Sequence, residues 1–285
     1  MINIRVIRRR IRGIRGIAKI TKAMEMIAAL KMRRAQEAGL AGRPYSEKIT
    51  QVLADLAALP ETGRALHPLL QRRPVTKIAI VHITPDRGLC GGLVTNVNRR
   101  TASFILEQDV PVTLVAVGRK GFDFMRRYGR DIRAEFTQLG DRPSLLDTLP
   151  ISHIIIDDYT KGVIDLVYLT YARFVSTMVQ RPMVQQILPI EPAAIPTAQN
   201  VDYIYEPGPA GVLGQLLPRF VEMQVYHAIL ESIASEQSAR MVAMRNATDN
   251  ATELIEDLTL LYNKARQESI TKELLDIVGG AAALA

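Results

Sequence analysis

A periodic apolar pattern in the last third of the sequence restricts the possible folds of this chain more than any other feature. From Leu213 to Ala265, mostly apolar residues recur at alternating steps of three and four, which places them along one narrow side of a helix. No Gly or Pro occurs between Arg219 and Val278. At 1.5 Å per residue, a helix of that length extends about 90 Å. Because no single small core covers such a rod, the pattern predicts a second long helix beside it.

The first part of the chain, residues 1–59, supplies the expected partner helix. Its apolar residues also recur at steps of three and four, and we expect them to form the stripe that faces the C-terminal helix. Pro44, close to Gly39 and Gly42, predicts a kink or a short break. Residues 59–63 contain Pro60 and Gly63 and should end the element. The predicted stripe consists of Ile4, Ile7, Ile11, Ile14, Ile17, Ile20, Met24 and Ile27, and resumes after Pro44.

The same N-terminal segment is strongly basic. Between residues 1 and 34 the only acidic residue is Glu25, whereas a solvated helix face normally mixes charges of both signs. The whole chain has a net charge of +7, which also favours an acidic partner. We therefore expect a dedicated acidic partner rather than a merely solvated face. The basic residues are Arg5, Arg8, Arg9, Arg10, Arg12, Arg15, Lys19, Lys22, Lys31, Arg33 and Arg34.

The region between the two helices has the pattern of a small α/β domain. Strands are expected at 75–83, 111–117, 165–174 and 183–188, the last two as an antiparallel hairpin, and helices at 93–108 and 119–128. For residues 144–160 the sequence does not decide between a strand and a helix. The run 153–156 and Pro150 favour a strand, whereas the length of the segment and the need for a crossover connection favour a helix. Residues 190–209 contain four prolines and read as a linker or loop.

Together these segments predict an α/β fold built around a long antiparallel two-helix coiled coil. Residues 1–59 and 209–285 would form the coiled coil, and residues 75–190 would form an inserted Rossmann-like domain. The sequence has no apolar run of 18 residues, so no membrane-spanning helix is expected. A single cysteine excludes a disulfide within the chain and fits a reducing compartment.

One glycine-rich segment, residues 86–92, follows the first predicted strand. Gly88, Gly91 and Gly92 suit a tight strand-to-helix turn, but the segment matches neither a dinucleotide fingerprint nor a P-loop. We interpret it as a structural turn and Cys90 as a small buried thiol. The four histidines are scattered and no group has metal-ligand spacing, so we expect neither a metal nor a cofactor, and no catalytic residues.

Basic coiled-coil helices also occur in nucleic-acid-binding proteins, and this is the alternative interpretation. Residues Arg5 to Arg15 have the charge to grip phosphates in the manner of a basic-region helix. Against this, isoleucines run through the same segment, and aromatic residues that stack on bases are absent there.

Three blocks of the sequence resemble the γ subunit of F-type ATP synthase. The first covers residues 11–32, the second is the glycine-rich segment with Leu93, and the third is distributed over residues 235–284. Val94 departs from the family pattern, which usually has Asn after Gly-Gly-Leu. The cysteine pair found in chloroplast-type members is absent here. The resemblance implies a non-catalytic central shaft that rotates inside a sleeve of α and β subunits and couples proton or sodium flow to ATP synthesis or hydrolysis. Nucleotide and magnesium would then belong to the α and β subunits.

The resemblance also implies which residues meet other subunits. Arg8, Arg9, Arg12 and Arg15 would face acidic loops of β, and Met24 would lie where the shaft meets β. Arg266 and Gln267 match positions that bond to a β loop. The residues expected to rest on the c ring beside ε are Tyr203, Tyr205 and Glu206. The protein would then be peripheral, at the cytoplasmic face of a bacterial plasma membrane.

Overall fold

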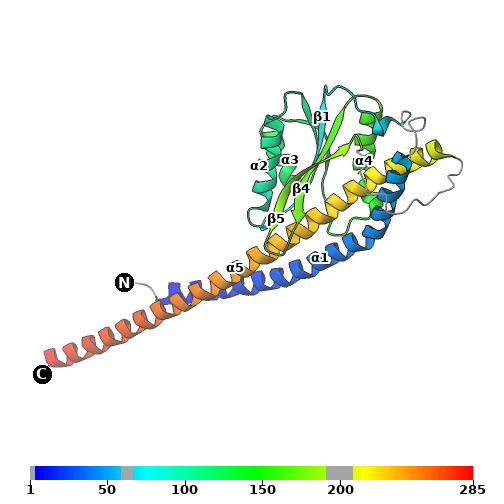
Figure 1. Cartoon of the computed structure of the whole chain (residues 1–285). Coiled ribbons are helices and arrows are strands. Elements are labelled where there is room, and N and C mark those ends of the chain that lie inside the picture. The colour runs from blue at the N-terminus through cyan, green and yellow to red at the C-terminus, as the bar shows by residue number, and fades with distance from the viewer. Residues whose placement is uncertain (1–3, 59–66, 191–207, 285) are drawn as a thin grey trace. The chain divides into compact units, whose positions relative to one another are not determined.

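The structure is a computed structural model that describes residues 4–58, 67–190 and 208–284. The chain divides into two compact units. Unit 1 combines residues 1–28 with 240–285, and unit 2 comprises residues 29–239. The two long helices α1 (Ile4–Ala58) and α5 (Pro209–Leu284) each contribute to both units. The sheet and all shorter helices belong to unit 2 (Figure 1).

The sheet of unit 2 has five strands in the order β3-β2-β1-β4-β5. Strands β1 (Ile78–Ile83), β2 (Val112–Val117), β3 (Asp131–Phe136) and β4 (Leu166–Phe174) are parallel, and β5 (Gln180–Leu188) pairs antiparallel with β4. The predicted hairpin is therefore confirmed, as is the α/β fold with long terminal helices. Strand β3 was not predicted.

Helices cover both faces of this sheet, because successive side chains of each buried strand point to opposite faces. Ile78 and Ile80 of β1 pack with α2 (Leu93–Leu106) and α3 (Arg119–Arg127). Ala79 and Val81 pack on the other face with α4 (Leu145–Thr160) and α5. The core of unit 2 is thus a sheet between two helical layers (Figure 1). A short 3-10 helix, Pro68–Leu70, precedes β1.

The segment 144–160, for which the sequence allowed a strand or a helix, forms helix α4. The Asp147 carboxylate accepts hydrogen bonds from the Ser144 backbone N–H at 2.7 Å and from the Ser144 hydroxyl at 2.8 Å, which fixes the first turn. A crossover on the helical face is also what a parallel connection from β3 to β4 requires. Pro150 lies inside the helix without ending it.

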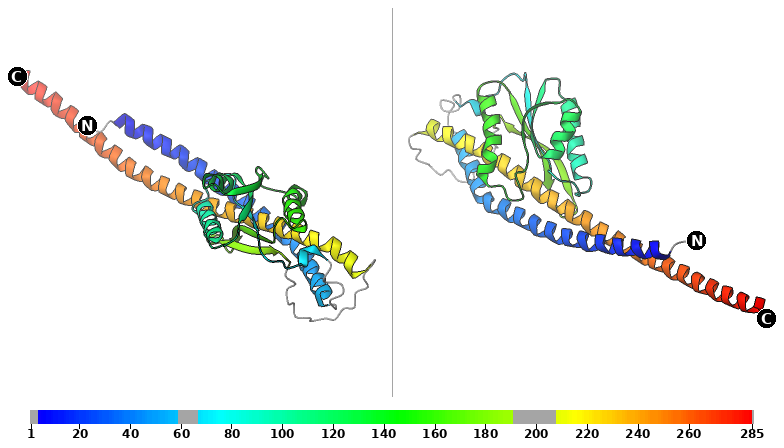
Figure 2. Two further views of the ribbon diagram at one scale, coloured as in Figure 1. Left: turned by 90° about the horizontal axis from the view of Figure 1, so that it is seen from above. Right: turned by 180° about the vertical axis from the view of Figure 1, so that it is seen from behind.

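Helix α1 stays helical through Pro44, so of the predicted kink or short break, the break does not occur. Gly42 lies against the imidazole of His227 on α5, and a Cβ added at Gly42 would be 2.7 Å from Cε1 of that ring. The absence of a side chain at Gly42 therefore leaves room for the imidazole of His227. Figure 2 shows α1 and α5 as long continuous helices in two further views. The predicted end of the helix at residues 59–63 and the predicted loop at 191–207 lie outside the described residues.

Candidate partner interface

Unit 1 contains an antiparallel pair of helical segments that pack through apolar side chains. Ile7 and Ile11 of α1 are buried together with Ala265 of α5. Half-buried residues on both helices complete this cluster, and they are Ile4, Ile255, Leu258 and Tyr262. The cluster pairs the start of α1 with the later part of α5, as the predicted antiparallel coiled coil requires.

Further along the same pair, polar side chains occupy the contact. The hydroxyl oxygens of Thr21 and Thr248 are 2.7 Å apart. The buried Glu25 carboxylate accepts hydrogen bonds from Lys22 Nζ at 3.0 Å and from Arg245 Nε at 3.1 Å. These contacts, the Lys22 hydrogen bond most of all, lower the pKa of Glu25 despite its burial. The single acidic residue among residues 1–34 therefore forms its ion pairs inside unit 1.

The buried side of α1 differs from the predicted stripe beyond Ile14. Burial follows an alternation of three and four through Ala18, Thr21, Glu25 and Ala28. The isoleucines predicted for this side are mostly exposed: 54% for Ile17, 62% for Ile20 and 52% for Ile27. That part of the prediction was wrong, because three successive steps of three rotate a stripe around the helix, whereas a heptad averages 3.5 residues.

The exposed side chains of α1 form what we call the outer face. It comprises the exposed apolar residues Ile17, Ile20 and Ile27 and the exposed arginines Arg8, Arg9, Arg12 and Arg15. None of these four arginines has an ion-pair partner among the described residues. An exposed surface that combines isoleucines with unpaired arginines has the composition of a protein interface with an acidic partner.

The other residues implied as partner contacts lie at two further places. Met24 is half-buried on α1, one residue before the Glu25 contact. Arg266 and Gln267 are both exposed and directly follow Ala265, the last buried residue among the described part of α5. Beyond them, apolar side chains of α5 are exposed, namely Ile270, Leu274, Leu275, Ile277 and Val278. Tyr203, Tyr205 and Glu206 lie outside the described residues.

The glycine-rich segment in unit 2 forms a compact turn between β1 and α2. Cys90 is 1% exposed, and its neighbours Leu89 and Gly91 have positive φ angles of 64° and 59°. The Asp86 carboxylate accepts hydrogen bonds from the backbone N–H groups of Arg119 and Gln138, both at 2.9 Å. Asp86 thus ties the turn to two neighbouring loops. Among the described residues there is no cluster of His, Cys, Asp or Glu suited to a metal ion.

The sequence of the whole chain matches known proteins of one kind. A family model described as ATP synthase matches residues 3–284. A protein of Dehalococcoides mccartyi (strain 195) called ATP synthase gamma chain is 70% identical over 285 residues, which is 100% of both chains. This chain belongs to the ATP synthase gamma chain family. A gamma chain from Roseiflexus sp. (strain RS-1) is 53% identical over 99% of this chain and 98% of the relative. None of these similarities supports the nucleic-acid-binding alternative.

Solved structures of ATP synthases have the same fold as this gamma chain family member. A chain in the Euglena gracilis mitochondrial ATP synthase, in an OSCP/F1/c-ring structure, superposes with a TM-score of 0.65 at 21% identity. The match covers 99% of this chain and 94% of that one. A chain in the central stalk/c-ring structure from Tetrahymena thermophila has a TM-score of 0.62 at 24% identity, over 80% of this chain and 99% of that one. Within the described residues, no helix is both long and apolar enough to cross a bilayer.

Two features of the interface escaped the sequence interpretation. The exposed isoleucines of the outer face were assigned to the buried side, and Glu25 was noticed only as an isolated acid. The strict alternation that begins at Ile4 contains the needed signal, because it leads to Thr21 and Glu25 and leaves Ile17 and Ile20 outside.

Proposed function

We propose that this gamma chain family member is the central shaft of an F-type ATP synthase. In this role it rotates inside a sleeve of three α and three β subunits and couples proton or sodium flow through the c ring to ATP synthesis or hydrolysis on β. The single observation that carries the proposal is the coiled coil of unit 1, whose outer face presents arginines without ion-pair partners among the described residues. The full-length similarity to gamma chains gives it independent support.

The chemistry of the outer face suits a surface that must form and release contacts repeatedly. Exposed ion pairs contribute about 1 kcal/mol or less each, so an arginine that meets an acidic β loop does not hold the shaft at one angle. Arg8, Arg9, Arg12 and Arg15 on α1, with Arg266 and Gln267 on α5, form several such weak contacts. Apolar side chains of α5 beyond Arg266, such as Leu274 and Val278, make contacts that have no preferred direction.

The cross-section of unit 1 also supports the proposal. Two paired helices lack threefold symmetry, so each of three identical β subunits meets different side chains at any one angle. Rotation then presents each side of the helix pair to each β subunit in turn. The chain transmits torque without making or breaking covalent bonds. Nucleotide and magnesium bind to the α and β subunits in this scheme, and this chain carries no catalytic residue or cofactor.

The remaining partners of this scheme are the ε subunit and the c ring. Tyr203, Tyr205 and Glu206 would rest on the c ring beside ε, which places the protein peripherally at the cytoplasmic face of the plasma membrane. The resemblance of their segment to the foot of known γ subunits supports this assignment.

Reconstitution of the chain with α and β subunits tests the shaft role directly. The complex is fixed through β, a bead is attached to the chain, and single particles are observed under ATP. We expect unidirectional rotation in three main steps per turn. A complex that hydrolyses ATP while the bead only fluctuates, with no net direction, would refute the proposal.

Met24→Lys tests where the shaft transmits torque. We expect it to leave ATP hydrolysis within about twofold of the parent and to lower coupled proton pumping several-fold, because an added cation strengthens one contact with acidic β loops unequally over the cycle. Both rates are measured on the complete enzyme in vesicles. Met26→Lys is the matched control, since Met26 is 56% exposed and two residues along the helix points in another direction. Equal loss of pumping in both variants would exclude a specific role for Met24.

A further inference from the structure

The hairpin formed by β4 and β5 in unit 2 carries two arginines that face each other. In the antiparallel register, Arg173 of β4 lies directly opposite Arg181 of β5, and both residues are exposed. Directly opposed residues project their side chains from the same face of a sheet, and two like charges in this position destabilise the strand pair. Neither arginine has an ion-pair partner among the described residues. The hairpin therefore carries a concentrated positive charge that the described part of the chain does not neutralise.

The turn between these two arginines exposes apolar side chains. Residues 175–179 are Val-Ser-Thr-Met-Val, and Val175, Met178 and Val179 are all exposed, Met178 by 71%. A turn that only connects two strands is usually rich in Gly, Pro, Asn, Asp and Ser, which suit the backbone geometry of turns. The need to close the hairpin therefore does not explain why this turn is apolar.

Hydrogen bonds to α5 hold the hairpin in place. The Ser235 hydroxyl donates to the Ala172 carbonyl at 2.8 Å, beside Arg173. The Ser238 hydroxyl donates to the Thr177 carbonyl, also at 2.8 Å, beside Met178. Both serines are buried, so these bonds are shielded from water. The backbone next to the exposed side chains is thus fixed on both sides of the turn.

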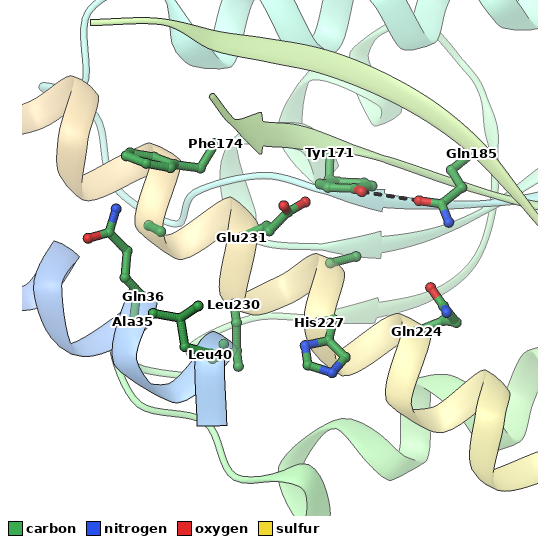
Figure 3. A pocket seen from close by; sticks show the side chains of 13 residues that line it. Ala35, Gln36, Leu40, Tyr171, Phe174, Gln185, Gln224, His227, Leu230 and Glu231 are labelled. Atoms are coloured by element: carbon green, nitrogen blue, oxygen red, sulfur yellow. Dashed lines mark hydrogen bonds between the residues drawn. The ribbon is translucent and has the colours of Figure 1, made fainter. Parts of the chain in front are cut away.

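Side chains also connect the two strands to each other. The Gln180 Nε2 group donates to the Thr177 carbonyl at 3.0 Å. Farther from the turn, the Tyr171 hydroxyl donates to Gln185 Oε1 at 3.1 Å, and Figure 3 shows this bond between β4 and β5. A surface that is already ordered before binding loses little conformational entropy when a partner docks. The hairpin therefore has the rigidity of a preformed binding surface.

We propose that this hairpin binds an acidic segment of another protein. Carboxylates of the partner relieve the repulsion between the two guanidinium groups through charge-assisted hydrogen bonds, and an apolar side chain of the partner covers Met178. Among residues 173–181, all of which the structure describes, there is no exposed aromatic side chain, which argues against stacking on bases and against insertion into a bilayer. The binding residues, which we call the hairpin surface, are Arg173, Val175, Met178, Val179 and Arg181.

One part of this proposal rests on the proposed function. We assign the acidic segment to another subunit of the ATP synthase, because the shaft role brings this chain into that assembly. The chemistry of the hairpin surface itself, with two opposed arginines around exposed apolar side chains, does not depend on rotation.

Photo-crosslinking in the complete enzyme tests the proposal. Met178 is replaced by p-benzoylphenylalanine, the enzyme is irradiated, and the crosslinked peptides are identified by mass spectrometry. We expect a crosslink to one segment of another subunit in which Asp or Glu residues flank an apolar residue. The same replacement at Val163, an exposed residue between α4 and β4, is the matched control and should not capture that segment. Products that contain only this chain, a lipid or a segment without acidic residues would overturn the proposal.

Arg181→Glu separates binding from a structural role. The change places a carboxylate opposite Arg173, so the isolated full-length chain should unfold at a higher urea concentration than the parent. In the complete enzyme the same change should lower the crosslink yield from position 178 about fivefold, because the partner's carboxylates then meet a negative charge. A lower yield in a more stable chain does not come from misfolding. An unchanged yield would contradict the proposal.

Two further variants show which property of the arginine matters. Arg181→Lys keeps the charge and should retain about half of the crosslink yield. Arg127→Glu makes the same change of net charge as Arg181→Glu, at an exposed residue of α3, and should alter the yield less than about twofold. Equal losses in the Arg127→Glu and Arg181→Glu variants would mean that the partner responds to the total charge of the chain, and the hairpin surface would be rejected.

Failure of this proposal is distinguishable from failure of the shaft role. An enzyme that rotates under ATP but gives no acidic crosslink at position 178 would reject the hairpin surface and leave the shaft role intact. An acidic crosslink that Arg181→Glu suppresses, in an enzyme without directed rotation, would support the hairpin surface and reject the shaft role.

Discussion

Replacement of Gly118 by alanine is expected to destabilise unit 2 by about 4 kcal/mol. Gly118 follows β2 and has a φ of 91°, in the region that side-chain-bearing residues rarely adopt. A Cβ at this position would be 1.8 Å from the backbone oxygen of Thr84, and backbone cannot rotate away as a side chain can. Thr84 is itself fixed, because its N–H donates to the Val117 carbonyl at 2.8 Å.

The same substitution at Gly129 separates the steric clash with Thr84 from the strain of a positive φ angle. Gly129 has a φ of 63°, but no atom lies within 4 Å of the Cβ that alanine would add. Gly129→Ala should therefore cost only about 1 kcal/mol, from strain alone. The free energy of unfolding is measured in urea by tyrosine fluorescence, which the absence of tryptophan makes usable. Similar losses in the two variants would show that contact with Thr84 is unimportant.

The sequence predicted the long helices because their pattern extends over many turns. From Leu213 to Ala265 the predicted stripe of α5 coincides with buried or half-buried residues, including the polar His227 and Gln237. The prediction for α1 was less accurate because this helix carries two apolar stripes. Isoleucines mark the exposed one, whereas small or polar residues such as Ala18 and Thr21 mark part of the buried one. Hydrophobicity alone does not reveal which of two stripes faces the partner helix.

Strand β3 was missed because it lies at the edge of the sheet. Its residues alternate between exposed and half-buried, and three of the six are charged: Asp131, Arg133 and Glu135. Within the described residues only β2 pairs with β3, so a strongly apolar sequence is not required. The helix at 145–160 was ambiguous for a different reason. Its first turn is fixed by the contact between Ser144 and Asp147, a local helix signal that the sequence interpretation did not consider beside the run 153–156.

The candidate interface was only partly predictable from the sequence. The concentration of basic residues from Arg5 to Arg34 predicted an acidic partner, and the resemblance to γ subunits indicated Arg8, Arg9, Arg12 and Arg15 within that segment. These four side chains are exposed. That Glu25 is already paired with Lys22 and Arg245 depends on a contact between residues 220 positions apart, which no local pattern encodes.

His82 is expected to make unit 2 less stable as the pH falls below 6.5. The ring is fully buried, and burial lowers the pKa of His82 to about 4. In the unfolded chain the group titrates near pH 6.5, so the unfolded state binds a proton first as the pH falls. The contribution of His82 is thus fully present above pH 6.5 and is lost progressively towards pH 4. Between pH 6.5 and 5 the expected loss is about 2 kcal/mol.

The neutral ring is held by partners on both sides. Nε2 lies 2.8 Å from Asn98 Oδ1 and donates its proton there, because a carboxamide oxygen can only accept. Nδ1 then accepts from the Thr170 hydroxyl at 2.9 Å. The Thr101 hydroxyl, which donates to the Val97 carbonyl at 3.0 Å, lies 3.1 Å from the same nitrogen. Protonation of Nδ1 would place a charge between β1 and α2 in a site without a compensating acid among these partners.

His82→Gln removes the titration and leaves the other histidines in place. We expect the variant to be about 2 kcal/mol less stable than the parent at pH 7, because the ring and its hydrogen bonds are lost. Near pH 5 this difference should almost vanish, since the parent alone has lost the contribution of His82. Urea unfolding at both pH values measures this difference in the free energy of unfolding.

His67 and His227, whose pKa values burial also lowers, contribute equally to both proteins and cancel in the comparison. A difference between parent and His82→Gln that stays constant from pH 7 to 5 would mean that His82 does not resist protonation, and that burial between β1 and α2 is not what sets its charge.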